Sequence, residues 1–155
     1  MSDPSDLKRF KTLRSLNAFI SNQKRFGRKY DLVAVKAHAR FLKVEAENPA
    51  NALEHAFWNR VVDYEAVLTE KAGRTVKAQY TRRTVKASSV HDFLTKMMRK
   101  DHTQGWKLLE GADRTDVSYE TVIDEFSDLF DEDVVKEARE RLKRKKPIDP
   151  KSDPL

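Results

Sequence analysis

The sequence predicts a mainly all-α protein, a compact bundle of six or seven helices with a disordered C-terminal tail. Apolar residues recur every three or four positions along most of the chain, which is the spacing of one face of a helix. Only four Gly and five Pro occur among 155 residues, so long helices with short connections are expected. The absence of Cys excludes a disulfide scaffold and a thiolate metal site.

We expect one domain over residues 1–146, in which residues 117–146 are a candidate helical subdomain. Residues 147–155 have too many Pro and too little to bury to form regular structure, so a flexible tail is predicted there.

The N-terminal part contains two predicted helices. The first begins after Ser5, which is a suitable N-cap, and ends at Gly27. Its apolar residues are Leu7, Phe10, Leu13, Leu16, Phe19 and Ile20. Residues 32–47 form the second helix, with Asp31 as its cap. Their alternation of apolar and charged residues is also typical of a half-buried strand, but a length of sixteen residues favours a helix.

The central helix is predicted over residues 49–72, between the Asn48-Pro49 boundary and Gly73. One apolar stripe runs along it and is made by Leu53, Phe57, Val61, Tyr64 and Leu68. We expect Trp58 and Trp106 to lie in the core, because their neighbours are apolar. Residues 74–87 are predicted as the next helix, although their Thr and Val content is compatible with a strand.

The C-terminal part contains three further helices and one short turn or helix. Ser89 caps a helix that ends near Lys100, and a short turn or helix covers residues 103–110. Residues 118–130 form an amphipathic helix with an acidic face. The last helix begins at Asp131, with acidic residues first and the basic residues up to Lys146 last, which suits the helix dipole.

Charge is distributed unevenly along the chain, whose net charge is +6. Residues 1–43 contain eleven Lys or Arg and three acids, whereas residues 110–133 contain ten acids and only Arg114 as a base. Surfaces of this kind attract charged partners.

The best functional candidate is the segment 71–86, which contains six cations and no acid. These cations are Lys71, Arg74, Lys77, Arg82, Arg83 and Lys86. A helix that buries Val76 and Tyr80 would present them to a phosphate backbone, with Arg25, Arg28 and Lys29 assisting. The sequence therefore favours a non-enzymatic nucleic-acid-binding or regulatory protein that contacts DNA or RNA. A merely solvated basic face and an acidic protein partner are the alternatives.

The rival function is a protein-interaction or self-assembly module. The acidic face of residues 118–130 would bind a basic partner or a second copy of the chain; it could also fold against the chain's own basic surface. Its residues are Glu120, Asp124, Glu125 and Asp128. They lack the spacing of a calcium loop, and the four histidines lack that of a zinc site, so no metal and no cofactor is expected. These histidines are His38, His55, His91 and His102.

Enzymatic activity is disfavoured, because no nucleophile triad or phosphate loop is present, and Ser88 and Ser89 lack the glycine elbow of a hydrolase. A deep pocket with a buried carboxylate or histidine would be the observation that favours a catalytic subdomain. Without a signal-like apolar stretch, a cytoplasmic location is expected. No apolar run approaches the roughly 18 residues that cross a bilayer, so a membrane partner is not expected.

Overall fold

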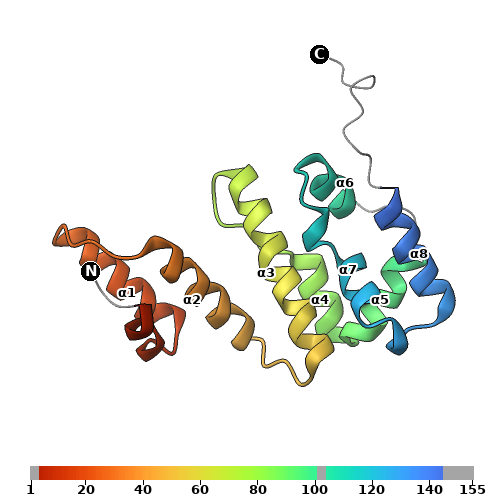
Figure 1. Ribbon diagram of the computed structural model, residues 1–155, viewed down its shortest axis with the longest axis horizontal. Helices are drawn as coiled ribbons and strands as arrows, with labels where there is room; N and C mark the ends of the chain where they lie inside the picture. Colours follow the sequence, from red (N-terminus) through yellow and green to blue (C-terminus); the bar gives the residue numbers. More distant parts are fainter. Residues whose placement is uncertain (1–3, 101–103, 145–155) are drawn as a thin grey trace, which may run out of the picture. The chain divides into compact units, whose positions relative to one another are not determined.

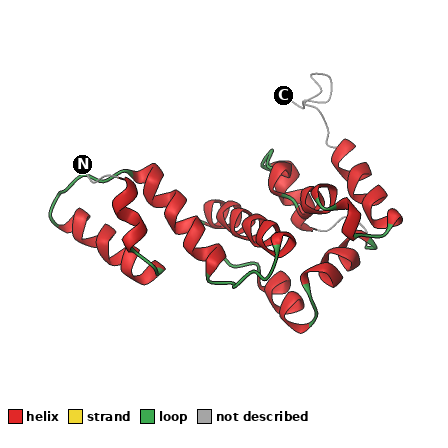
Figure 2. Cartoon of the chain, turned by 60° about the horizontal axis from the view of Figure 1, so that its bottom comes forward, coloured by secondary structure: helices red, strands yellow, loops and turns green. Residues whose placement is uncertain are grey.

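The computed structural model describes residues 4–100 and 104–144 (Figure 1). This part of the chain contains eight α-helices and three 3₁₀ helices, and it contains no strand (Figure 2). The all-α prediction is confirmed, with more α-helices than the six or seven expected. The strand alternatives for residues 32–47 and 74–87 are wrong. The predicted tail, residues 147–155, lies outside the described residues.

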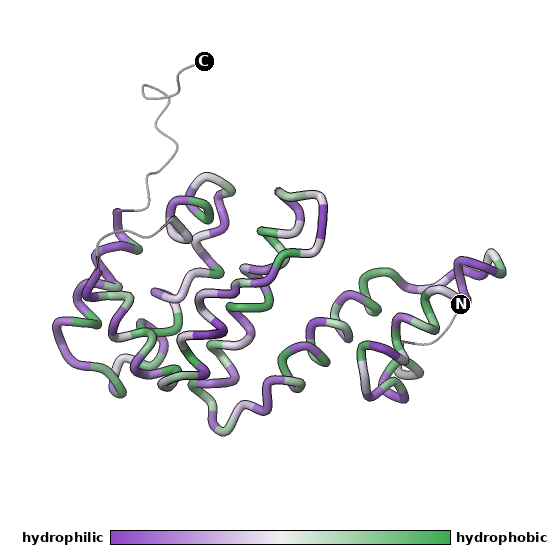
Figure 3. The backbone as a smooth tube through the Cα atoms, turned by 180° about the vertical axis from the view of Figure 1, so that it is seen from behind, coloured by the Kyte–Doolittle hydropathy of each residue, from purple (hydrophilic) through white to green (hydrophobic). Residues whose placement is uncertain are grey.

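The chain divides into two compact units, Met1–Val62 and Asp63–Leu155, and each is described by itself. The single domain over residues 1–146 and the subdomain 117–146 stay predictions. Hydrophobic and hydrophilic residues alternate along the helices of both units (Figure 3). No helix among the described residues combines the length and apolar character needed to cross a membrane.

The first unit begins with a 3₁₀ helix, η1 (Pro4–Arg9), followed by α1 (Leu13–Arg25). The prediction of one continuous helix after Ser5 is therefore wrong. Thr12 adopts an extended backbone, and its Oγ1 accepts a hydrogen bond from the Ser15 N–H at 3.1 Å. A Thr side chain that bonds to the backbone in this way favours the start of a helix over its interior, so a new helix begins at residue 13.

A glycine turn ends α1 as predicted. Gly27 has φ 63°, the left-handed conformation that Gly adopts without a steric penalty. The Gly27 N–H donates to the Lys24 carbonyl at 3.2 Å, and the Arg28 N–H donates to the Gln23 carbonyl at 2.8 Å. This pair of bonds is a Schellman motif.

The other helices of the first unit are α2 (Leu32–Glu45) and the first half of α3 (Ala52–Ala72). The Asp31 cap is confirmed, since its Oδ1 accepts from the Ala34 N–H at 3.1 Å. The α3 helix begins at Ala52 and not at Pro49, because the Asn51 side chain caps it by accepting from the Glu54 N–H at 3.0 Å. Four buried side chains form the core between η1, α1 and α2: Leu7, Leu16, Val35 and Leu42.

The second unit contains the rest of α3 and the elements that follow it. These are α4 (Gln79–Ala87), α5 (Val90–Met98), α6 (Gln104–Gly111), η2 (Thr115–Val117), α7 (Tyr119–Glu125), η3 (Ser127–Leu129) and α8 (Glu132–Lys143). Ser89 caps α5 as predicted, accepting from the Asp92 N–H at 3.0 Å. Trp58 in the first unit and Trp106 in the second are both buried, which confirms the core prediction for both.

The predicted continuous helix over residues 118–130 is wrong. The α7 helix ends at Glu125, because Phe126 leaves helical geometry (φ −110°, ψ 39°) and a 3₁₀ turn follows. Phe130 is then extended, and its buried ring stacks on His91 with centroids 4.7 Å apart. Burial of the Phe130 ring and its stacking on His91 thus outweigh continuation of the helix.

Candidate nucleic-acid interface

A buried carboxylate on α3 fixes the start of α4. Glu65 accepts hydrogen bonds from Arg82 Nε at 2.7 Å and Arg82 Nη2 at 2.8 Å, and from the Ala78 N–H at 2.7 Å. Burial alone would raise the pKa of the Glu65 carboxyl, but these hydrogen bonds and the Arg82 charge lower it below its ordinary value. The Glu65 side chain therefore stays ionised, and it holds the Ala78 backbone and the Arg82 side chain in place at the start of α4.

The loop between α3 and α4, residues 73–78, is also fixed to α3. Gly73 reverses the chain with φ 69°, and the Val76 N–H donates to Thr69 Oγ1 at 3.0 Å. The prediction of a helix from residue 74 is therefore wrong at its start, because the loop's backbone groups bond to α3 side chains. Arg74 and Lys77 lie on this loop and not on a helix.

The side of α4 that packs on the unit also differs from the prediction. Val76 lies in the loop and Tyr80 is 45% exposed, so neither is the buried residue that was expected. Thr81 is buried instead, with its hydroxyl 3.0 Å from the Tyr119 hydroxyl. The helix starts five residues later than predicted, and its buried side carries Thr81 and the half-buried Val85.

Five of the six predicted cations of this segment are exposed and form no ion pair in the described part of the chain. They are Lys71, Arg74, Lys77, Arg83 and Lys86. Arg82 differs, because its ion pair with Glu65 leaves only 23% of its side chain exposed. The segment is thus fixed through the ion pair of Arg82, and its other five cations are exposed to solvent.

Arg25, Arg28 and Lys29 lie in the first unit, on the glycine turn that ends α1. All three are exposed, and none of them forms an ion pair with a described residue. Between the two arginines lies Phe26, which is 59% exposed, with the Arg25 and Arg28 guanidinium carbons 5.4 and 5.2 Å from its ring centroid. Phe26 is not among the residues predicted from the sequence, although an aromatic residue close to two Arg in a predicted turn was an available signal.

The C-terminal acids pair with arginines outside the candidate set. Asp124 accepts from Arg139 at 2.8 Å, and Arg99 lies 3.3 Å from Asp131 and 3.5 Å from Asp133. Glu125 and Asp128 are exposed and form no ion pair within the described residues. The alternative interaction surface therefore depends on these two acids, since Glu120 does not lie on it.

Glu120 is 5% exposed, so the expectation that it belongs to the exposed acidic face is wrong. Its Oε1 accepts from Arg141 Nη1 at 3.4 Å, and burial raises the pKa of this carboxyl. Arg141 is only 1% exposed and also donates to Glu137 Oε1 at 2.9 Å and to three backbone carbonyls, those of Met97, Met98 and Lys100. Its position seven residues after the buried Val134 was a signal that Arg141 faces the core.

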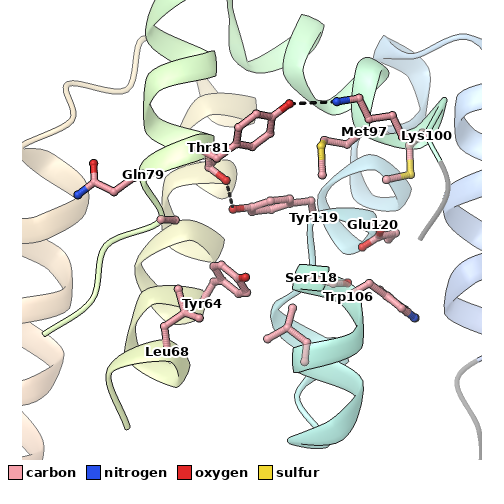
Figure 4. A pocket seen from close by; sticks show the side chains of 15 residues that line it. Tyr64, Leu68, Gln79, Thr81, Met97, Lys100, Trp106, Ser118, Tyr119 and Glu120 are labelled. Carbon is pink, nitrogen blue, oxygen red and sulfur yellow. Dashed lines mark hydrogen bonds between the residues drawn. The ribbon is translucent and has the colours of Figure 1, made fainter. Parts of the chain in front are cut away.

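A cavity of about 350 Å³ lies in the second unit, among α3, α4, α5, α6 and α7 (Figure 4). Its wall includes Tyr64, Leu68, Met97, Trp106, Tyr119 and Glu120. A cavity beside a buried carboxylate is the observation that would favour catalysis. Here, however, Arg141 already engages Glu120, and most of the wall is aromatic or aliphatic.

The described histidines make structural contacts. His38 Nε2 lies 2.8 Å from the Phe10 carbonyl oxygen, and His91 Nε2 lies 2.7 Å from that of Leu129. His55 Nδ1 is 3.0 Å from Asn59 Nδ2. His102 lies outside the described residues. Within the described ranges, no group of three or more His, Asp or Glu residues could hold a metal ion.

No protein-family model, curated protein or solved structure matches this chain.

Proposed function

We propose that this protein binds nucleic acid without catalysing a reaction, through the basic segment formed by Lys71, Arg74, Lys77, Arg83 and Lys86. One observation carries the proposal: all five side chains are exposed and without an ion pair in the described structure, although the segment is ordered through Glu65. A loop and a short helix that are fixed at their base present these charges at little cost in backbone entropy on binding.

Binding would occur by neutralisation of phosphates and release of counterions. Gln79 is exposed on α4 and offers a neutral hydrogen-bonding group near the cations. Arg82 has a different role from the one expected, because its guanidinium is held by Glu65; it positions the segment and does not contact phosphate.

The test compares two variants of equal net charge. In the first variant, four cations of the basic segment are changed to Gln: Arg74, Lys77, Arg83 and Lys86. The control variant changes four exposed lysines elsewhere on the chain to Gln: Lys36, Lys43, Lys136 and Lys143. Binding to a labelled duplex and to a labelled single strand is measured by fluorescence anisotropy at several salt concentrations.

The first variant should weaken binding by at least about tenfold at low salt, and its log–log salt slope on duplex should fall by up to about 3.6, or roughly 0.9 per lost phosphate contact. The control should keep most of the affinity and slope. Equal losses in the two variants would show that only net charge matters, and the proposal would then fail.

A further inference from the structure

The cavity of the second unit has the walls of a site for a planar ring. Figure 4 shows Tyr64 and Leu68 of α3 on one side and Trp106 of α6 on the other, with Tyr119 between them. Met97 of α5 adds a polarisable sulfur atom. Aromatic and thioether side chains favour flat aromatic groups, and a volume of about 350 Å³ lies within the range of small-molecule sites.

The rim of this cavity is positively charged. Lys100 Nζ donates to the Tyr80 hydroxyl at 3.0 Å and lies 5.5 Å from the centroid of the Tyr80 ring. Lys96, one turn earlier on α5, is exposed, and its charge also acts on the Tyr80 hydroxyl. The rim therefore suits an anionic substituent on the ring that enters the cavity.

The wall also contains an unsatisfied polar group. The Ser118 side chain is buried, and its hydroxyl forms no close hydrogen bond with a described residue, although it lies near enough to Glu120 to act on the pKa of that carboxyl. Three other wall hydroxyls are engaged, those of Tyr119 and Thr81 with each other and that of Tyr80 with Lys100. A buried hydroxyl without a partner is costly in a core but is useful beside a ligand that carries polar edge atoms.

We infer that this cavity receives an unpaired nucleobase while Lys100 and Lys96 contact its phosphate. The inference rests on the proposed function. A base is planar, carries polar edge atoms and is joined to an anion, which are the three properties that the wall, Ser118 and the rim select. The basic segment also belongs to the same unit and continues directly into the cavity wall at Gln79, Tyr80 and Thr81. Aromatic stacking of unpaired bases is a general mode of single-strand recognition.

The decisive comparison uses two labelled single strands of the same length, one with normal bases and one with an abasic backbone. Wild-type protein should bind the base-bearing strand about tenfold or more tightly, which is the usual effect of one stacked base. Tyr80→Ala and Leu68→Trp should reduce its affinity to nearly that of the abasic strand, by loss of an aromatic ring of the wall and by filling of the cavity. Binding of the abasic strand should change much less, because both variants keep Lys100 and Lys96.

Phe41→Ala is the matched control, because it removes a 53% exposed aromatic ring from the first unit, and it should have no effect on either strand. Thermal melting by circular dichroism checks that each variant folds. If Leu68→Trp does not fold, the result for Tyr80→Ala decides, since Tyr80 is exposed.

A second readout uses Trp58→Phe, which leaves Trp106 as the single tryptophan of the chain. Its emission should change on addition of the base-bearing strand and not of the abasic strand. The same change with adenosine monophosphate would identify a free nucleotide as a source of the base, and its absence would identify the polymer as the source.

Equal wild-type affinity for the two strands would overturn the inference. The proposed function would survive that result if the four-cation variant still lost its salt-dependent binding.

Discussion

The C-terminal part of the second unit and the basic turn of the first unit differ in how their charges are paired. In the second unit, carboxylates pair with arginines of the same unit, as Asp124 does with Arg139 and Asp116 with Arg114 at 3.1 Å. In the first unit, the glycine turn leaves Arg25, Arg28 and Lys29 without a carboxylate partner in the described structure. The paired acids of residues 116–133 named above thus use arginines of their own unit, and the five exposed cations of segment 71–86 form no ion pair with a described residue. Net charge along the sequence is a poor guide to surface charge, because pairing is local.

The choice of cation sharpens this comparison. The ion pairs of Asp and Glu given above for the second unit all use Arg, whose planar guanidinium fits a carboxylate and is more weakly hydrated than the ammonium of Lys. The exposed pairs contribute at most about 1 kcal/mol each. The Arg141–Glu120 pair and the Arg82–Glu65 pair are expected to contribute more to stability. In both pairs the carboxylate is buried, so removal of its arginine leaves a charged group without a partner away from water.

The largest expected effect comes from Arg141→Met. The substitution leaves Glu120 as an unpaired buried carboxylate and removes donors from three backbone carbonyls. We expect the free energy of unfolding to fall by about 3–5 kcal/mol, measured by urea denaturation.

Arg139→Met is the matched control, because this arginine forms an exposed pair with Asp124 on the same helix. Its cost should be at most about 1 kcal/mol. Equal costs for the two substitutions would show that burial does not distinguish the two pairs.

The next effect concerns the base of the proposed interface. Glu65→Gln should lower the free energy of unfolding by about 2 kcal/mol at neutral pH, because the carboxylate accepts from Arg82 and from the Ala78 N–H. Since folding lowers the pKa of Glu65, its stabilising contribution is present above the ordinary value of 4.5 and is lost as the pH falls through the folded-state pKa.

The difference in stability between wild type and Glu65→Gln should therefore shrink below pH 4.5, as followed by urea denaturation at a series of pH values. A difference that does not change with pH would contradict the role given to the ionised carboxylate.

Sequence patterns were sufficient for helix content and for most caps. Asp31, Gly27 and Ser89 all act as predicted, because capping depends on a few neighbouring residues. The breaks at Thr12 and Phe126 were missed, since each depends on a competition between continuing a helix and a local bond or tertiary burial. The spacing of apolar residues alone does not show which of the two wins.

The candidate site was predicted less completely than the fold. The exposed cations of segment 71–86 could be found from composition, but the role of Arg82 depends on Glu65, seventeen residues away in sequence. The cavity could not be predicted at all, because Tyr64, Trp106 and Tyr119 come from three separate elements. Only the packing of the second unit brings them together.

The smallest expected effect concerns the basic turn of the first unit, residues 25–29. It tests whether the left-handed backbone of Gly27 or the contacts of the charged side chains fix the conformation of this turn. Gly27 has φ 63° and would meet no atom within 4 Å if a Cβ were added, so Gly27→Ala tests backbone strain alone. The substitution should destabilise the protein by about 1–2 kcal/mol in urea denaturation.

Gly111→Ala is the matched control, because Gly111 ends α6 without a positive φ and also has open space around it; it should be neutral or slightly stabilising. If both changes were neutral, the left-handed backbone at Gly27 would not determine the conformation of the turn. The two guanidinium–ring contacts would then have to hold Arg25 and Arg28 on either side of Phe26.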